Sequence, residues 1–399
     1  MKLKRLPADF IVEELSDFVL GDGPFAVYQL DKRSIGTPEA ITAICERWNL
    51  PRKRLSYGGL KDKHAITRQY VTIHHGQKRH LNQGSFDLTY MGQAAQHFTA
   101  QDIAGNCFTV VMRDLTSLEA EQAVAAVADV QDSGLPNYFD DQRFGSLGVS
   151  GEWIAKFWCQ GNYERALWLA MAEPHKEDRA NERREKEILR EHWGKWVACK
   201  AALDRSHRRS LVTNLADKEA VGKPPEFRMA FGCLNIDLRG LYLSAFQSAL
   251  WNRLLTMQLQ TQFPSERLVP FELESGRSYF IRGLTRAESE PLTKTLLPLP
   301  AARQKIEPGP LLDMINRVCA DEGMEMRELR VKYPRDSFFS KGLRAACVQP
   351  TDMTARIDDD ELYPRHKKVL LTFGLPRGSY ATILVKRLTG GAGSLAEET

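Results

Sequence analysis

The chain has 399 residues, 43% of them hydrophobic and 27% charged, which is typical of globular proteins and excludes disordered, collagen-like and fibrous chains. Lysine and arginine number 55 against 51 aspartate and glutamate residues, so the net charge is only +4 and any nucleic-acid surface must be a local patch. Seven cysteines without a C-x-x-C pair favour a reducing compartment over a disulfide framework or a zinc site. The sequence shows neither a membrane-spanning apolar run nor a signal peptide. We therefore expect a soluble, cytoplasmic protein.

The first third of the chain alternates predicted strands with two predicted helices. Strands rich in β-branched and aromatic residues are predicted at 10–15, 24–30, 69–75 and 107–112. Apolar residues at helical spacing predict helices over 37–48 and 117–132. In the second helix we expect Ser117 to be the N-cap, because a glutamate follows close behind it.

The middle of the chain is predicted to be helical and its end to return to strands. Charges of both signs are interleaved over 175–207, which predicts an exposed helical insertion. Residues 241–255 have an apolar face and predict a buried helix. Further strands are predicted at 327–333, 343–349, 367–375 and 380–388. Strands at both ends around a helical middle indicate one domain inserted into another.

A basic stretch from Arg52 to His80 contains a single acid, Asp62. Its cations are Arg52, Lys53, Arg54, Lys61, Lys63, Arg68, Lys78 and Arg79. Because Asp62 stands between Lys61 and Lys63, we expect its pKa to be lowered, and an ionised carboxylate can act as a nucleophile. The preceding pair of glycines allows a sharp turn or a close approach to a ligand, and the cations can neutralise phosphates. The alternative is that Asp62 is only a partner in surface ion pairs.

A second candidate loop is the stretch GLPNYFDDQRFG at residues 134–145. Its aromatic and amide side chains could stack on a flipped base and hydrogen-bond its edge. The alternative is structural: Tyr138 and Phe144 would anchor the loop in a core, and Arg143 would pair with Asp140 or Asp141.

Several other chemistries lack their sequence patterns. His74 and His75 should point to opposite faces of a strand, which argues against joint metal ligation. The sequence has no Walker loop, no G-x-G-x-x-G, no G-x-S-x-G and no zinc-deaminase pattern. We therefore expect either an enzyme without cofactor or metal, or a binding protein.

Six motifs in order along the chain resemble those of the TruD family of tRNA pseudouridine synthases. They are ADFIVEE (8–14), GGLKDKHAITRQ (58–69), GNCFTVVMRDL (105–115), GLPNYFDDQRFG (134–145), YLSAFQSALWN (242–252) and LPRGSYAT (375–382). The family pattern has glycine where this chain has Asp140, which adds a charge and a Cβ to that loop. The resemblance implies an α/β (α+β) fold, with a catalytic domain around a central antiparallel sheet at 1–150 and 326–399. An insertion domain would occupy 151–325.

The resemblance also implies residue roles. Asp62 would be the catalytic aspartate that assists breakage of the glycosidic bond, and Lys61 would lie beside it. Phe10, Asn137 and Tyr380 would bind or frame the uridine, with Phe139 next to the flipped base. Contacts to RNA would come from Arg52, Lys53, Arg54, Lys63 and Arg143.

The expected activity is isomerisation of uridine to pseudouridine in tRNA, at uridine 13. This reaction needs no redox partner and no energy source, which agrees with the missing nucleotide and metal motifs. Two alternatives stay open: the same reaction at another RNA site, or a tRNA-binding protein that remodels RNA without catalysis. We expect a monomer that binds RNA and no membrane.

Overall fold

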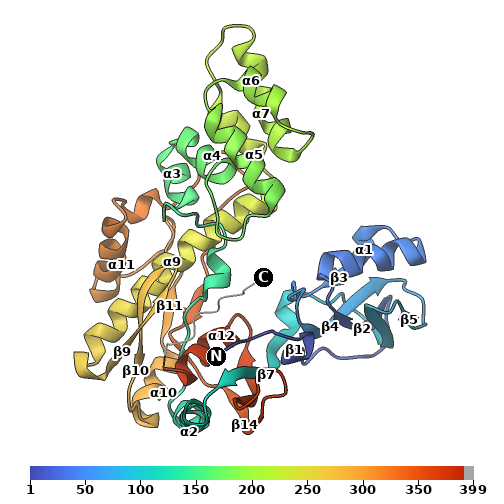
Figure 1. Cartoon of the computed structure of the whole chain (residues 1–399), viewed down its shortest axis with the longest axis vertical. Helices are drawn as coiled ribbons and strands as arrows, with labels where there is room; N and C mark the ends of the chain where they lie inside the picture. Colours follow the sequence, from blue (N-terminus) through green and yellow to red (C-terminus); the bar gives the residue numbers. More distant parts are fainter. Residues whose placement is uncertain (391–399) are drawn as a thin grey trace. The chain divides into compact units, whose positions relative to one another are not determined.

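The computed structural model describes residues 1–390 and divides the chain into two compact units (Figure 1). The first unit consists of Met1–Asn137, Arg282–Thr295 and Cys347–Thr399, the last segment described to residue 390. The second consists of Tyr138–Ile281 and Leu296–Ala346. That the one is a catalytic domain and the other an insertion, with the bounds expected above, stays a prediction. No helix among the described residues is long and apolar enough to cross a membrane.

A nine-stranded sheet forms the centre of the first unit. Its strands are β1 (Phe10–Ser16), β2 (Phe25–Arg33), β3 (Leu55–Tyr57), β4 (Ile66–His74), β5 (Leu81–Asn82), β6 (Phe86–Ala94), β7 (Ile103–Leu115), β14 (Thr351–Asp359) and β15 (Lys367–Pro376). The order is β14-β15-β7-β1-β4-β2-β6-β5, with β3 beside β4. All pairs are antiparallel except β1 with β4, which is parallel. The expected α+β fold is confirmed, and the four strands predicted before residue 115 overlap β1, β2, β4 and β7, with Pro24 and His75 lying just outside β2 and β4.

Helix α1 (Thr37–Trp48) covers one part of this sheet and has the predicted bounds. It begins after Gly36 with a proline in its first turn, and it ends at Asn49, whose φ of 51° is left-handed. The helix buries Ala40, Ile41, Ile44 and Trp48 in one apolar cluster with residues of β2, β3, β4 and β6. Its apolar face therefore closes the core under the N-terminal half of the sheet.

Helix α2 (Ser117–Ser133) packs against β14 and β15, and α10 (Arg286–Lys294) and α12 (Ala381–Leu388) pack against α2. The predicted N-cap is wrong by one residue. Thr116 is the cap, and its hydroxyl accepts from the amide of Glu119, whose carboxylate accepts from Thr116 in return. A two-stranded pair, β8 (Leu135–Pro136) with β13 (Cys347–Val348), completes the first unit.

Two of the strands predicted near the C-terminus are wrong. Residues 381–388 form α12 because their buried apolar residues recur at helical spacing, at Ala381, Leu384, Val385 and Leu388. Residues 327–333 form no strand; the first two belong to a short 3-10 turn, η6 (Met326–Glu328), and the rest run as coil. Their β-branched and aromatic composition favours a strand, but tertiary packing overrides it.

The second unit is mainly helical and is organised around α9 (Ile236–Gln262), a helix of 27 residues (Figure 1). The predicted apolar face is confirmed, because Leu243, Phe246, Leu250 and Leu254 are buried. Its other elements are η4 (Asp141–Phe144), α3 (Ile154–Gln160), α4 (Tyr163–Met171), α5 (Ala180–Glu191), α6 (Trp196–Ala202), α7 (His207–Glu219), α8 (Phe227–Gly232), η5 (Ser265–Arg267), β9 (Leu268–Leu273), β10 (Gly276–Ile281), β11 (Leu296–Pro298), α11 (Pro310–Asp321) and β12 (Leu343–Ala345).

The charged stretch 175–207 holds α5 and α6 instead of one solvated helix. Both helices have a buried side, because Leu189, Trp196 and Cys199 are each at most 2% exposed. Lys186 is also buried, and its Nζ pairs with Asp178 at 2.5 Å. The stretch is therefore folded into the second unit through one face and is exposed only on the other.

Candidate active site

Asp62 lies in the loop between β3 and β4, which close packing and hydrogen bonds hold in place. A Cβ at Gly58 would come within 2.5 Å of Ile103 Cδ1, so this position requires glycine for a close approach. The side-chain amide of Gln69 donates to the Gly59 carbonyl at 3.2 Å. The Thr37 hydroxyl accepts from the backbone N–H of Lys61 at 3.1 Å. The glycine, lysine and glutamine of the motif thus fix the backbone that precedes the aspartate.

The carboxylate of Asp62 is paired with Lys4. Lys4 Nζ lies 2.6 Å from Asp62 Oδ2, and the backbone N–H of His64 donates to Oδ1 at 2.9 Å. Burial raises the pKa of Asp62. The hydrogen bond and charge of Lys4, together with the hydrogen bond from the His64 N–H, lower the pKa by more, so that the net pKa is below its usual value. The side chain of Asp62 keeps 31% of its exposure. The expected ionised carboxylate is confirmed in direction, but Lys4 rather than Lys63 provides its cation.

The N-terminal segment that carries Lys4 is anchored by Arg113. Backbone bonds join Lys2 and Arg113 in both directions, at 2.8 and 2.9 Å. The Arg113 guanidinium, 3% exposed, binds the carboxylate of Asp9 and also pairs with Asp360 at 2.9 Å. Asp9 in turn accepts from the backbone N–H of Leu6. Because these bonds lie on both sides of Lys4, the ammonium group is held toward Asp62.

Phe10, at the start of β1, lies under the same cation. Lys4 Nζ is 4.6 Å from the centroid of the Phe10 ring, which is within reach of a cation–π interaction. The ring packs edge-on against Phe108 at 6.2 Å between centroids, and Phe108 stacks on Phe373 at 5.4 Å. Phe10 is 6% exposed. Lys4 thus contacts both the Phe10 ring and the Asp62 carboxylate. The predicted contact of Phe10 with uridine stays a prediction.

Lys61 turns away from Asp62 and toward β1 and β7. Its Nζ pairs with Glu14 Oε1 at 3.0 Å and donates to Asn106 Oδ1 at 2.6 Å. Glu14 is 4% exposed; burial raises its pKa above the usual value, against the lowering effects of Lys61 and of the Tyr70 N–H. Lys61 therefore attaches the Asp62 loop to β1 and β7.

Lys32 is a second buried cation beneath the loop. Its Nζ donates to the backbone carbonyls of Asp62 at 2.6 Å and of Ile35 at 2.9 Å. Burial lowers the pKa of Lys32 to about 8, although the nearby Asp62 carboxylate raises it. The backbone carbonyl of Asp62 is thus bound by one lysine and its carboxylate by another.

Asn137 and Tyr380 belong to the first unit as well. Asn137 follows β8 and is 6% exposed. Tyr380 is half-buried and is the N-cap residue of α12, at the end of a turn in which Gly378 has a φ of 83°. Their predicted contacts with uridine stay a prediction.

The loop with Phe139 and Arg143 lies in the second unit, where packing holds it. Asn252 of α9 accepts from the Phe139 N–H and donates to its carbonyl, both at 2.8 Å. The guanidinium of Arg344 lies 4.0 Å from the Phe139 ring centroid, and that of Arg143 lies 5.7 Å away. Arg143 also donates to Ser248 at 3.3 Å.

The anchoring role considered for this loop is seen in Tyr138 and Phe144, which are at most 2% exposed. Asp140, where the family pattern has glycine, has a φ of −88°, which any residue can adopt. The Cβ at this position therefore does not strain the backbone.

The basic residues near Asp62 have mixed surroundings. Arg52 donates to the Leu55 carbonyl, and Arg54 donates to the carbonyls of His74 and His75, so both guanidiniums help to shape the chain. Lys53 and Lys63 are exposed. Binding of RNA by these four residues stays a prediction.

The prediction that His74 and His75 point to opposite faces of a strand is wrong. Their ring centroids are 4.1 Å apart, because β4 ends at His74 and His75 has a left-handed φ of 50° that breaks the alternation of side chains. Even so, no group of three histidine, cysteine, aspartate or glutamate residues within residues 1–390 is arranged to hold a metal ion.

Sequence reasoning missed Lys4, Lys32, Glu14 and Asn106. Glu14 and Asn106 stand inside the motifs at 8–14 and 105–115, so the motifs carried a signal that was not used. Lys4 and Lys32 lie outside all six motifs, and their contacts with Asp62 span 58 and 30 residues of chain.

Comparisons with known proteins identify the family of the chain. The family model "tRNA pseudouridine synthase D (TruD)" matches residues 1–388. The Methanococcus maripaludis protein "Probable tRNA pseudouridine synthase D 1" is 29% identical over 97% of this chain and 99% of its own. The "tRNA pseudouridine synthase D" of Aquifex aeolicus is 26% identical over 97% and 98%. A crystal structure of a TruD protein from Methanosarcina mazei matches the fold with a TM-score of 0.70, at 23% identity over 97% of this chain and 93% of that one. The chain belongs to the tRNA pseudouridine synthase D (TruD) family, a family of isomerases.

Proposed function

We propose that this chain converts uridine to pseudouridine in tRNA, at uridine 13, with Asp62 as the catalytic carboxylate. The observation that carries the proposal is the ion pair of Asp62 with Lys4, which favours the ionised form of a partly exposed carboxylate in a loop whose backbone is hydrogen-bonded just before it. The relatives named for this activity match the chain over almost its full length.

The reaction rearranges bonds without oxidation or reduction. The bond between ribose C1′ and uracil N1 breaks, the base turns, and a bond from C1′ to C5 forms. The proton on C5 is lost to solvent and N1 gains one, so atoms and charge balance. Assistance by attack on the sugar carbon and assistance by removal of a sugar proton both begin from an ionised carboxylate, which is the form that Lys4 favours.

Residues of the first unit are proposed to surround the uridine. Phe10 offers an aromatic ring beside the Lys4–Asp62 pair, and Lys61 supports the loop through Glu14. Asn137 and Tyr380 are proposed from their motif positions, as is Phe139 in the second unit. A flipped base costs a few kcal/mol to unstack, and stacking on aromatic rings offsets this cost.

Exposed cations are proposed to bind the tRNA backbone. Lys53 and Lys63 belong to the stretch that carries Asp62, and Arg52 and Arg54 lie on the same short turn, η2 (Arg52–Arg54). Arg143 is proposed as a further contact from its motif. We also propose that the protein acts in the cytoplasm and that it is a monomer. Light scattering after gel filtration would measure its molar mass and so test the oligomeric state.

The test is tritium release from tRNA transcripts labelled at C5 of uridine. We expect release by the wild type and by Asp17→Asn, an exposed aspartate of the same unit, and none by Asp62→Asn. A transcript with cytidine at position 13 should release none. Release from that transcript would move the reaction to another site, whereas tight binding by a silent wild type would indicate a remodelling protein without catalysis.

A further inference from the structure

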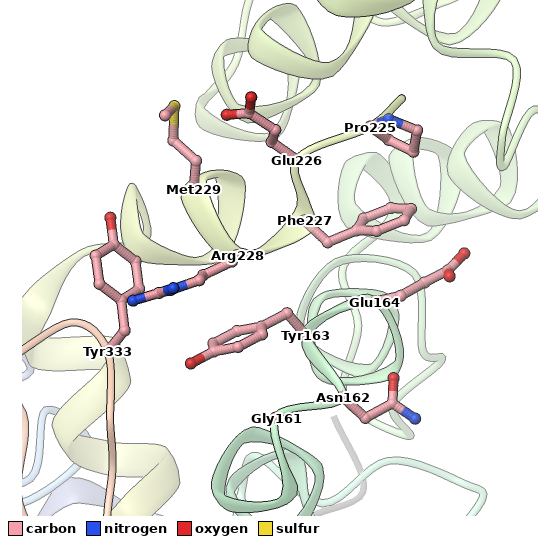
Figure 2. A pocket seen from close by; sticks show the side chains of 10 residues that line it. All are labelled: Gly161, Asn162, Tyr163, Glu164, Pro225, Glu226, Phe227, Arg228, Met229 and Tyr333. Carbon is pink, nitrogen blue, oxygen red and sulfur yellow. The ribbon is translucent and has the colours of Figure 1, made fainter. Parts of the chain in front are cut away.

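A pocket of about 620 Å³ lies within the second unit and shares no residue with the Asp62 loop (Figure 2). It is formed by residues before and at the start of α4 and α8, together with the coil around Tyr333. Its aromatic side chains are Tyr163, Phe227 and Tyr333, all partly exposed, and Arg228 reaches between them. This volume lies in the range of pockets that hold small organic ligands.

Neighbouring residues hold the rings of Tyr333 and Phe227 in place. The indole N–H of Trp158 donates to the Tyr333 carbonyl at 2.7 Å, and a Cβ at Gly232 would come within 2.8 Å of the Tyr333 ring. Phe227 packs against Trp196, with 5.9 Å between ring centroids, and lies parallel to Trp193 within 4°. The rings are therefore preformed surfaces, and little freedom is lost when a flat ligand stacks on them.

Arg228 lines the pocket, and three further cations lie within three residues of Tyr333 in the sequence. The guanidinium of Arg228 lies 4.5 Å from the Tyr333 ring centroid, and neither it nor the exposed Arg330, Lys332 and Arg335 forms an ion pair within residues 1–390. Glu226, a carboxylate that lines the pocket, does have a charged partner, because it is paired with Lys218 at 2.9 Å. The positive charge near Tyr333 is thus left for an outside anion.

We propose that this pocket binds an unpaired nucleobase of the RNA substrate, stacked on Tyr333 or Phe227, with the neighbouring phosphates on the cations around Tyr333. The inference rests on the proposed function for the identity of the RNA. Unpaired RNA bases characteristically stack on aromatic rings and on arginine planes, and cations hold the flanking phosphates. This pocket combines all three groups in one place.

The first test compares Tyr333→Ala with Tyr333→Phe in the full-length protein. Binding of a fluorescent tRNA transcript is measured by anisotropy, and tritium release is measured at saturating RNA. We expect Tyr333→Ala to weaken binding about 5- to 100-fold, which is the effect of losing one stacked base, with kcat unchanged. Tyr333→Phe keeps the ring and should bind as the wild type does. Wild-type affinity in Tyr333→Ala would overturn the inference.

A second pair of variants protects the test against misfolding. Arg228→Gln and Lys332→Gln change exposed side chains, so circular dichroism should match the wild type. Each should lower the slope of log affinity against log salt by about 0.7, the value for one contact with a single strand. An unchanged slope in both variants, with unchanged affinity, would reject the pocket as an RNA site whatever Tyr333→Ala does.

The outcomes separate this inference from the proposed function. A wild type that isomerises uridine while all pocket variants bind normally contradicts the pocket alone. A wild type that binds the transcript through the pocket but releases no tritium contradicts the proposed function alone.

Discussion

Two loops that carry family motifs are held in different ways. The Asp62 loop of the first unit depends on charge, through Lys4 on the carboxylate, Lys32 on the backbone and Lys61 on Glu14. The Phe139 loop of the second unit depends on the Asn252 amide and on buried rings. The charged contacts of the first loop favour the ionised form of the partly exposed Asp62 carboxylate, whereas the contacts of the second loop hold the backbone of Phe139 in place. Substitutions in the first should alter chemistry, and substitutions in the second should alter stability.

The largest effect is expected from the buried charge that anchors the Lys4 segment. Arg113→Met leaves the carboxylates of Asp9 and Asp360 buried at 1% and 5% exposure without their cation. We expect the free energy of unfolding in urea to fall by about 3–5 kcal/mol. The control is Arg277→Met, which breaks a solvent-exposed pair with Glu272 and should leave the unfolding free energy close to that of the wild type. Equal losses in the two variants would show that the anchor is not the buried network.

Lys4→Met should separate chemistry from folding at the Asp62 loop. We expect kcat to fall about 100-fold, because the carboxylate loses both its orientation and its counter-charge. Asp62 acts ionised, so activity is lost as pH falls through its pKa. Since Lys4 lowers that pKa, its removal should move the acidic limb of kcat/KM to higher pH.

The matched control for Lys4→Met is Lys2→Met, two residues away in the same segment. The backbone bonds of Lys2 with Arg113 do not need its side chain, so this variant should keep the wild-type pH profile. An acidic limb that stays in place in Lys4→Met would mean that another group sets the ionisation of Asp62.

Asn252→Ala tests the packed loop. It removes the partners of the buried N–H and carbonyl of Phe139, and we expect a loss of about 2 kcal/mol in unfolding free energy. The pH dependence of the remaining activity should not change. Ser275→Ala breaks only one bond to the same amide and should cost less. A shifted pH profile in Asn252→Ala would contradict the division between the two loops.

The smallest effect is expected from a single surface cation. Lys53→Gln should weaken tRNA binding a few-fold at low salt and lower the salt slope by about 0.7–0.9, with kcat unchanged. Glu46→Gln, an exposed residue of α1, serves as the control and should leave the slope as it is. A wild-type slope for Lys53→Gln would remove this residue from the proposed RNA surface.

Local sequence patterns predict an element correctly where the spacing of its apolar residues determines which side is buried. Helix α1 has its predicted bounds because its apolar face and its proline and Asn49 ends are all local features. The strand prediction at 380–388 follows from β-branched residues, whereas the helix α12 follows from buried residues at helical spacing that pack against α2. The same limit applies at His75, where one left-handed residue changes the face that a side chain points to.

At the candidate site, the sequence predicts the lowered pKa of Asp62 but not the contacts that cause it. Asp62 was found because its neighbours in sequence are unusual, and the lowered pKa follows the predicted direction. The cause was assigned to adjacent lysines, whereas Lys61 pairs with Glu14 and the cation on Asp62 comes from Lys4, 58 residues away. A contact over that distance has no local signal in a single sequence.

The most direct measurement is tritium release from C5-labelled tRNA in a single turnover, with enzyme in excess so that all RNA is bound. The account predicts that Asp62→Asn slows release by at least about 1,000-fold while the affinity for tRNA and the circular dichroism stay those of the wild type. Release by Asp62→Asn at the wild-type rate would contradict the claim that this carboxylate performs the chemistry.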